Sequence, residues 1–477
     1  MVILENELLD LGLCDIADLI ARKQVTSLEV TTASIHAAQK AGVETNSIAA
    51  LETEQALHRA AQLDAFLARK GVRSSLHGVP IANKDMFYRR GFVTGCGSKI
   101  REDFIPDYTA TVVERLEDAG AVTIGRLRMA EFAMSPTGHN RHYGAGRNPW
   151  DLDRCTGGSS SGSGAAVASR VIFGSIGSDT GGSIRMPAAM CGVTGIKPTQ
   201  GRVSRYGAMP LAFSVDCVGP IARTAKDCAR LLTWIAGEDE RDTTASRETV
   251  PDYERALNGE VKGLRIGYAP NLFGFETADV LEAAVEEALS VLVARGAVAC
   301  SVDLPHLPAI AAYAGVVQRA EMATIHAEWM RASRQDYGTN VSARLYAGYG
   351  IPATAYIEAL SRRGALVSAL CNEVFDKVDV LICPTLTMPV PTIQETDVDT
   401  GSRDAADNFG HVSENCRLVN YLGLPAISLP CGFDSSGMPI GLQMIGLPFD
   451  EAMLLKVADA YQRETDWHRK RPKAIAS

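Results

Sequence analysis

Stretches with a helical repeat of apolar residues alternate along this chain with short runs rich in Val and Ile. This alternation is typical of an α/β fold, in which helices cover a sheet. One helix begins with a capping box of Thr26 and Glu29, and another follows Thr224. The spacing of apolar residues predicts helices over 27–40, 50–69, 110–119, 225–236, 278–295 and 451–464.

The short apolar runs are predicted strands. Several of them are apolar without alternation, as expected when a sheet is buried on both faces. We therefore expect an α/β fold with a central mixed, largely parallel β-sheet covered by helices on both faces. The predicted strands are 121–125, 171–176, 264–268, 298–302, 378–383, 426–430 and 440–445.

Two polar stretches interrupt this pattern. Residues 237–262 carry dense charge, and residues 395–414 are rich in Asp, Thr, Ser and Gly. Either could link two domains, but the alternation of strands and helices resumes after each. Surface excursions from a single domain spanning 1–477 are the better interpretation.

The net charge and the cysteine pattern indicate which binding partners and which cellular compartment to expect. The net charge is −9, and no Lys/Arg block is suited to a phosphate backbone, so direct nucleic-acid binding is not expected. The eleven cysteines are scattered without a C-x-x-C pair, which favours reduced thiols in a cytoplasmic protein. No signal peptide is predicted, and no run has the roughly 18 to 20 apolar residues of a membrane helix.

The most informative stretch is 155–199, CTGGSSSGSGAAVASRVIFGSIGSDTGGSIRMPAAMCGVTGIKPT. A flexible linker is the simplest interpretation of such Gly and Ser content, but here both glycine clusters run directly into helix-forming or apolar segments. Paired glycines before a serine let the backbone aim several N–H groups at one point beside the hydroxyl. We expect Thr180, Gly181, Gly182 and Ser183 to form an oxyanion hole, with Ser183 as nucleophile.

A serine nucleophile needs a base. His139 and His142 lie close together in PTGHNRHYG, but a pair on a turn-rich segment is more often structural than a metal site or part of a triad. The G-x-S-x-G elbow of α/β-hydrolases is absent at Ser183, because Arg185 stands where the second glycine would be. Neither histidine is therefore favoured as the base.

Lys84 is the remaining candidate base. In HGVPIANKDMF it follows a turn and a short apolar run, so it should lie at the end of a strand or in a buried loop. Burial lowers the pKa of a lysine, and a neutral lysine is a competent general base. From the residues alone, an ion pair with Asp85 is the commoner role for such a lysine.

These residues resemble the amidase signature family, whose pattern is a lysine, a G-G-S-S-x-G serine and a D-x-G-G-S-x-R serine. Here the pattern is met by Lys84, Ser159 and Ser183, which are separated by 75 and 24 positions. The resemblance covers about 78–227 and resumes at LGLPAISLPCGF and GMPIGLQMIG.

The resemblance implies a mechanism. Ser183 attacks a carbonyl, Ser159 passes on the proton from a cis peptide bond, and neutral Lys84 receives it. An acyl-enzyme forms and is hydrolysed by water. No metal and no other cofactor is implied.

The resemblance also assigns supporting roles to neighbouring residues. Ser160 is expected to hydrogen-bond into the catalytic network. Asp179 and Arg185 flank the nucleophile and are expected to fix its loop, most simply as a structural ion pair. By their place in the family pattern, Met134, Ser135 and Gly158 lie beside the substrate, although core packing explains Met134 equally well.

The central segments ERLEDAGAVTIGRLRMAEFAM, GRNPWDLDR and GRVSRYGAM also resemble the A-subunit of glutamyl-tRNA amidotransferases. The alternative function is therefore that of the glutaminase subunit of a glutamyl-tRNA(Gln)/aspartyl-tRNA(Asn) amidotransferase. Glutamine would require charged groups in the pocket, and the third quarter of the chain shows few. We expect instead a free-standing hydrolase of a small amide, anilide or carbamate.

Two further alternatives belong to other classes. A noncatalytic scaffold is disfavoured by the complete Lys-Ser-Ser set, and insensitivity to chelators would remove a zinc hydrolase. The expected partner is a small-molecule amide-type substrate, with no membrane contact. A homodimer is compatible with this sequence.

Overall fold

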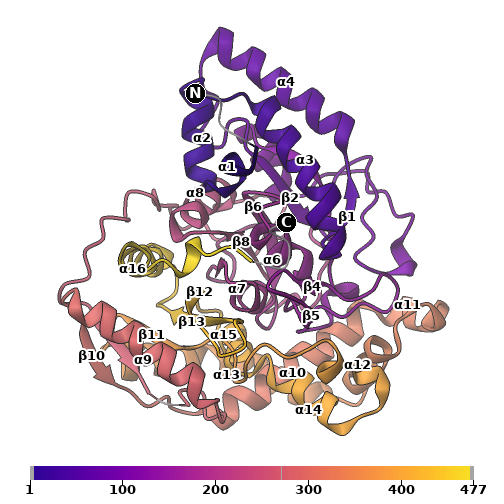
Figure 1. Ribbon diagram of the computed structural model, residues 1–477. Helices are drawn as coiled ribbons and strands as arrows, with labels where there is room; N and C mark the ends of the chain where they lie inside the picture. The colour runs from indigo at the N-terminus through magenta and orange to yellow at the C-terminus, as the bar shows by residue number, and fades with distance from the viewer. Residues whose placement is uncertain (1–4, 270, 473–477) are drawn as a thin grey trace.

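A mixed sheet forms the centre of the fold (Figure 1). The computed structural model describes residues 5–269 and 271–472, and within them eight strands follow the order β10-β9-β11-β13-β12-β7-β8-β6. Their bounds are β6 (Gly174–Asp179), β7 (Thr194–Lys197), β8 (Cys217–Ala222), β9 (Arg265–Tyr268), β10 (Val298–Ser301), β11 (Val380–Pro384), β12 (Ala426–Phe433) and β13 (Pro439–Ile445).

The mixed α/β class is confirmed, but the expectation of a largely parallel sheet is wrong. Only the β10–β9 and β9–β11 pairings are parallel among the described strands of this sheet. The pairings from β11 through β13, β12, β7 and β8 to β6 are antiparallel. A continuous apolar run indicates that both faces of the sheet are buried at that strand, but it does not indicate whether the strand is parallel or antiparallel to its neighbours.

A smaller sheet adjoins the β6 edge. Its order is β1-β3-β2, with β1 (Ile48–Leu51) antiparallel and β2 (Pro80–Lys84) parallel to β3 (Val122–Leu127). The Ile176 N–H of β6 donates to Asn83 Oδ1 of β2 at 3.3 Å. The ends of β2 and β6 therefore lie close together.

Helices cover both faces of the large sheet. Two consecutive residues of β7 show this, because successive side chains of a strand point to opposite faces of the sheet. The Thr194 hydroxyl accepts a hydrogen bond from Gln462 of α16 at 3.0 Å. The next residue, Gly195, faces α7, where a Cβ on Gly195 would lie 3.0 Å from the Ala188 Cβ. The helices that pack against the sheet include α7 (Arg185–Cys191) on one face, and α8 (Ala225–Ile235), α9 (Asp279–Ala294) and α16 (Glu451–Glu464) on the other.

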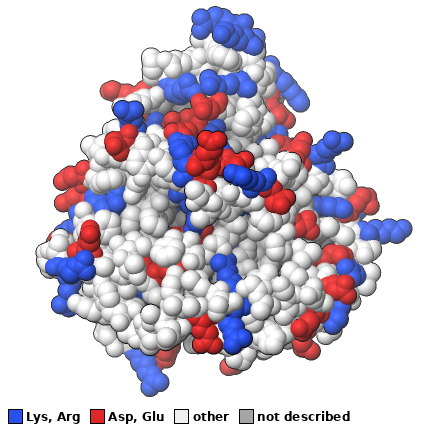
Figure 2. Space-filling model, turned by 180° about the vertical axis from the view of Figure 1, so that it is seen from behind, with Lys and Arg blue, Asp and Glu red and all other residues white. Residues whose placement is uncertain are grey.

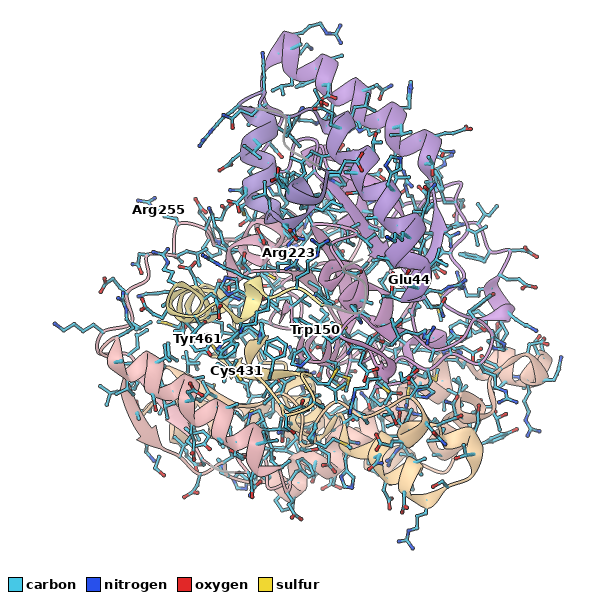
Figure 3. All side chains as sticks on the ribbon, in the orientation of Figure 1. Glu44, Trp150, Arg223, Arg255, Cys431 and Tyr461 are labelled. Carbon is cyan, nitrogen blue, oxygen red and sulfur yellow. The ribbon has the colours of Figure 1, made fainter. Side chains whose placement is uncertain are left out.

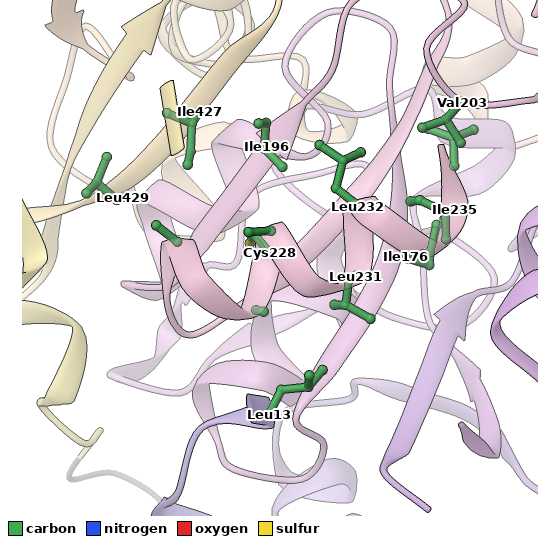
Figure 4. Packing of buried hydrophobic residues seen from close by; sticks show 14 of the residues in the cluster. Leu13, Ile176, Ile196, Val203, Cys228, Leu231, Leu232, Ile235, Ile427 and Leu429 are labelled. Carbon is green, nitrogen blue, oxygen red and sulfur yellow. The ribbon is translucent and has the colours of Figure 1, made fainter. Parts of the chain in front are cut away.

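The α8 face of the core is shown in Figure 4. Leu232 of α8 points toward Ile196 of β7, whereas Leu231 points to the other side of the helix, toward Leu13, and all four belong to one buried hydrophobic cluster. At the far side of β12, Tyr461 of α16 lies beside Cys431 (Figure 3). This packing fixes the sheet on which the ends of β6 and β7 are held.

The remaining helices form two groups. In the N-terminal group, α3 and α4, at the top of Figure 1, pack with α6 against the small sheet, whereas α1 packs on α3, and α2 and α5 pack on α8. A second group lies below the large sheet. The first group is α1 (Glu5–Asp10), α2 (Leu13–Ala21), α3 (Ser27–Glu44), α4 (Thr53–Lys70), α5 (Thr111–Ala119) and α6 (Ser161–Ala168). The second is α10 (Leu307–Ile325), α11 (Ala327–Ala332), α12 (Thr339–Tyr349), α13 (Ala353–Leu370), α14 (Arg403–His411) and α15 (Glu414–Leu422).

The predicted helices agree with the structure except at one end. The capping box of Thr26 and Glu29 is confirmed, and the Thr224 side chain accepts the Asp227 N–H at the start of α8. Residues 50 and 51 belong to β1 and not to α4. Ala50 has a high helix propensity, but pairing with β3 overrides it.

The strand predicted at 171–176 is displaced, because β6 begins at Gly174 and continues to Asp179. The apolar residues 171–173 fill the buried connection from α6. The polar second half of β6 pairs with β8 along its whole length. Pairing partners, and not hydrophobicity, therefore set the bounds of this strand.

The two polar stretches differ in structure. Residues 238–262 contain turns without a helix or strand, whereas 395–414 contains α14. On the face seen in Figure 2, acidic and basic side chains lie near one another in scattered groups, with wide areas of other residues between them. Among the described helices, none is long and apolar enough to cross a membrane.

Candidate active site

Lys84 is the last residue of β2, and its side chain is only 1% exposed. Its Nζ lies 2.6 Å from Ser159 Oγ and 2.9 Å from Ser178 Oγ. The prediction that Lys84 lies buried at the end of a strand is confirmed. Ser178, which was not among the predicted site residues, accepts a second hydrogen bond from the Lys84 amine.

Burial lowers the pKa of Lys84 to about 7, although the carboxylates of Asp179 and Asp216 raise it in part. At neutral pH a large share of the Lys84 amines is therefore uncharged. Asp85 does not pair with Lys84: its Oδ1 accepts a hydrogen bond from Arg126 Nη1 at 2.7 Å. The ion-pair role for Lys84 is wrong.

Ser159 and Ser160 lie immediately before α6. The Gly158–Ser159 peptide bond is cis, as the family resemblance implied. Ser159 O accepts the Ala130 N–H at 3.1 Å, and the Ser160 N–H donates to Ser183 O at 3.4 Å. Ser160 Oγ donates to Ser178 O at 3.4 Å. The segments of the two predicted catalytic serines are thus joined through Ser160.

Ser183 follows the end of β6 in a tight loop. The Asp179 carboxylate organises this loop by accepting the backbone N–H groups of Gly182 at 2.7 Å and of Ile184 at 3.2 Å. The Gly182 N–H is therefore engaged, and the expectation that it donates to an oxyanion is corrected. Thr180, Gly181 and Ser183 stay the expected donors.

Asp179 and Arg185 form an ion pair that is wholly buried. Arg185 Nε and Nη2 each donate to the Asp179 carboxylate at 3.0 Å. Burial alone would raise the pKa of Asp179, but the guanidinium holds it well below its usual range. Asn420 Nδ2 adds a hydrogen bond to Asp179 Oδ1 at 2.9 Å. The predicted structural ion pair is confirmed, and it holds the loop that carries Ser183.

Two residues that no sequence motif marks fix Thr180. The Thr180 hydroxyl donates to Asp216 Oδ1 at 2.5 Å, and Gln318 Nε2 donates to Thr180 O at 2.9 Å. Gln318 is 138 positions from Thr180 in the chain, and no local pattern could have found it.

A cavity of about 450 Å³ opens beside Ser183, and Ser135, Thr180 and Gly181 also line it. This volume suits a small organic ligand. Met134 does not line the cavity, because its side chain packs in the core and only its carbonyl reaches the site. Gly158 is packed so closely that a Cβ there would lie 2.3 Å from Ser135 O. Neither Met134 nor Gly158 lines this cavity, and their place beside a substrate stays a prediction.

The cavity is strongly basic. Arg319 of α10, Arg344 of α12 and Arg417 of α15 line it, whereas no Asp or Glu appears among the described lining residues. The expectation of a weakly charged pocket is wrong. Few charges occur in this part of the sequence, but helix packing gathers these three at one place.

The two histidines have structural roles, as predicted. His139 lies between Thr137 Oγ1 and the Ile393 carbonyl, at 2.7 and 3.0 Å, and His142 Nε2 lies 2.9 Å from Glu131 Oε1. No group of three or more His, Cys, Asp or Glu residues within the described chain is arranged to hold a metal ion.

Comparison with known proteins agrees with this geometry. Residues 29–455 match the family model described as Amidase. The A-subunit of the glutamyl-tRNA(Gln) amidotransferase of Moorella thermoacetica is 40% identical, over 96% of this chain and 97% of that protein.

Solved structures show the same fold. A chain of a vestigial protein complex, described as revealing the evolutionary origins of an s-triazine catabolic enzyme, has a TM-score of 0.88 and 32% identity, over 95% of this chain and 98% of its own. A 6-aminohexanoate cyclic dimer hydrolase complexed with substrate has a TM-score of 0.89 and 26% identity, over 98% and 99% of the two chains.

Proposed function

This chain belongs to the amidase signature family, whose members are hydrolases acting on carbon–nitrogen bonds, and we propose on that premise that it cleaves a small amide through an acyl-enzyme. The observation that carries the proposal is the contact between the buried Lys84 amine and Ser159 Oγ at 2.6 Å. A buried lysine with a pKa of about 7 is available as a base at neutral pH.

In the proposed first step, Ser183 Oγ attacks the amide carbonyl carbon. The Ser183 proton passes to Ser159 Oγ while the Ser159 proton passes to the neutral Lys84 Nζ. The carbonyl oxygen becomes an oxyanion, which the backbone N–H groups of Thr180, Gly181 and Ser183 stabilise. Each such donor typically lowers the barrier by about 3 to 4 kcal/mol.

The tetrahedral intermediate then loses its amine. The proton on Lys84 returns through Ser159 to the leaving nitrogen as the carbon–nitrogen bond breaks, and an ester to Ser183 is left. Water repeats the sequence with Lys84 as base, which releases the acid and restores the Ser183 hydroxyl. No proton is gained or lost by the enzyme over the cycle.

A fluorophosphonate probe tests the nucleophile directly. The wild-type protein should be labelled on Ser183, and Ser183→Ala should lose both the label and amide hydrolysis. Labelling at another serine, or hydrolysis retained by Ser183→Ala, would refute the proposal.

A second candidate is the glutaminase role in a tRNA-dependent amidotransferase. The 40% identity to the Moorella protein over nearly the whole chain favours it. In that role the same site would release ammonia from glutamine and act together with partner proteins. Glutaminase assays with and without those partners and glutamyl-tRNA separate the two candidates, because a free-standing amidase needs neither.

A further inference from the structure

The basic wall of the cavity is assembled from three helices that are distant in sequence. Arg344 of α12 is half-buried, and its Nη1 donates to Met134 O at 2.9 Å while its guanidinium lies 5.6 Å from the Phe409 ring. These contacts fix the Arg344 side chain at the wall. Arg417 is also half-buried, whereas Arg319, which lines the cavity from α10, is exposed.

None of these three arginines forms an ion pair with a carboxylate of the described chain. Arginines that are partly removed from water normally have an anionic partner, because their hydration is lost and like charges repel. Burial, together with nearby Arg417 and Arg319, lowers the pKa of Arg344 to about 10. The Arg344 guanidinium therefore stays charged at neutral pH.

We infer that the acyl part of the substrate carries a carboxylate and no ammonium group, as in the monoamide of a small dicarboxylic acid. This inference rests on the proposed function, because it assigns the substrate class of the same site. The carboxylate supplies the anion that the arginines lack, through charge-assisted hydrogen bonds. The amide at the other end then lies beside Ser183.

The same wall disfavours glutamine. Glutamine has the required carboxylate, but its ammonium needs an acceptor of negative charge. The described lining offers hydroxyls, such as that of Ser413, and no carboxylate. The ammonium would therefore lie among guanidiniums without a counter-charge, which is unfavourable.

A series of amides tests the inference. The monoamides oxamate, malonamate, succinamate and glutaramate vary the distance between amide and carboxylate. Acetamide, propionamide, butyramide and valeramide are their respective neutral analogues, and glutamine differs from glutaramate only by its amino group. We expect the best monoamide to exceed its neutral analogue in kcat/KM by about 10- to 100-fold, as for hydrogen bonds to charged groups. Glutaramate should likewise exceed glutamine.

Variants locate the effect. Arg344→Gln and Arg417→Gln should each raise KM for the preferred monoamide about 10-fold or more while changing butyramide hydrolysis little. Arg403→Gln on α14, whose side chain is 93% exposed, is the matched control and should change neither. Because the wild-type comparison needs no variant, it decides the question even if a variant fails to fold.

The failures can be told apart. Preference for neutral amides, or for glutamine over glutaramate, would overturn the inference and leave the amidase proposal standing. If no amide is hydrolysed and Ser183 is not labelled by a fluorophosphonate, the proposed function itself fails.

Discussion

Ser178 Oγ accepts a hydrogen bond from Lys84 Nζ at 2.9 Å, and Ser178 directly precedes Asp179 at the end of β6. The amine is thereby tied to the strand from which the Ser183 loop begins. A displacement of β2 relative to β6 would move Lys84, the proposed base, away from Ser183, the proposed nucleophile. The contact between the two sheets is therefore part of the proposed active site.

Lys84→Met should reduce amide hydrolysis by about 10²- to 10⁴-fold, the usual contribution of general acid–base catalysis. The measurement is kcat/KM for the preferred amide. Lys197 is the matched control: it is equally buried, on β7, but its Nζ donates to Pro198 O and not to a serine. Lys197→Met should keep most of the activity. Full turnover in Lys84→Met would refute Lys84 as the base.

The pH profile should show the titration of Lys84. Because the neutral amine is the base, kcat/KM should rise with pH to a plateau, with an apparent pKa near 7. A profile that falls through neutral pH, or is flat from about pH 6 to about pH 9, contradicts this assignment.

Stability should depend on pH through the same lysine. The folded pKa of about 7 is below the ordinary value of 10.5, so between these values the unfolded chain binds more protons than the folded one. The penalty for burying Lys84 is thus complete below pH 7 and declines as the pH rises toward 10.5. Lys84→Met removes this penalty. Its Tm relative to wild type should therefore be highest near about pH 6 and decline toward about pH 9, and a constant difference would contradict the prediction.

Asp179→Asn should destabilise the fold by about 3 to 5 kcal/mol, because it leaves the buried Arg185 charge uncompensated. Denaturant unfolding measures this loss. Asp407→Asn, in an exposed pair with Arg403 on α14, is the control and should have little effect. Equal unfolding free energies for the two variants would show that the buried pair does not hold the loop.

Gly182→Ala should abolish most activity. Gly182 has φ of 115°, and a Cβ there would lie 2.6 Å from Cys416 Cβ, so the nucleophile loop would have to shift. Gly364→Ala within α13 has open space around the new methyl group and should be neutral or stabilising by up to about 1 kcal/mol. Assays of turnover and Tm for both variants separate a local effect from general sensitivity to Gly→Ala changes.

The parts of this protein that the sequence predicts well are those set by local pattern. The strand that ends at Lys84 follows from a turn and an apolar run, and the capping box at Thr26 follows from residue spacing. The direction of the strands in the large sheet does not follow from local sequence, because it depends on which distant segments pair. The sequence also predicted that the Gly182 N–H donates to an oxyanion, but in the structure the Asp179 side chain accepts this N–H.

The charge of the pocket is the property that the sequence predicted least well, and the cause is also long-range. Arg319, Arg344 and Arg417 are far apart in the chain, and each alone looks like ordinary surface charge on a helix. Their gathering depends on how α10, α12 and α15 pack against one another. No single window of sequence contains that information.

The proposed catalytic residues lie within 84–183, whereas the arginines of the pocket come from helices more than a hundred residues later. Under the proposed function, bond cleavage and substrate choice are encoded in separate stretches of the gene. Substitutions in α10, α12 and α15 would then change which acid is accepted without touching Lys84, Ser159 or Ser183. Evolution could alter one property and keep the other.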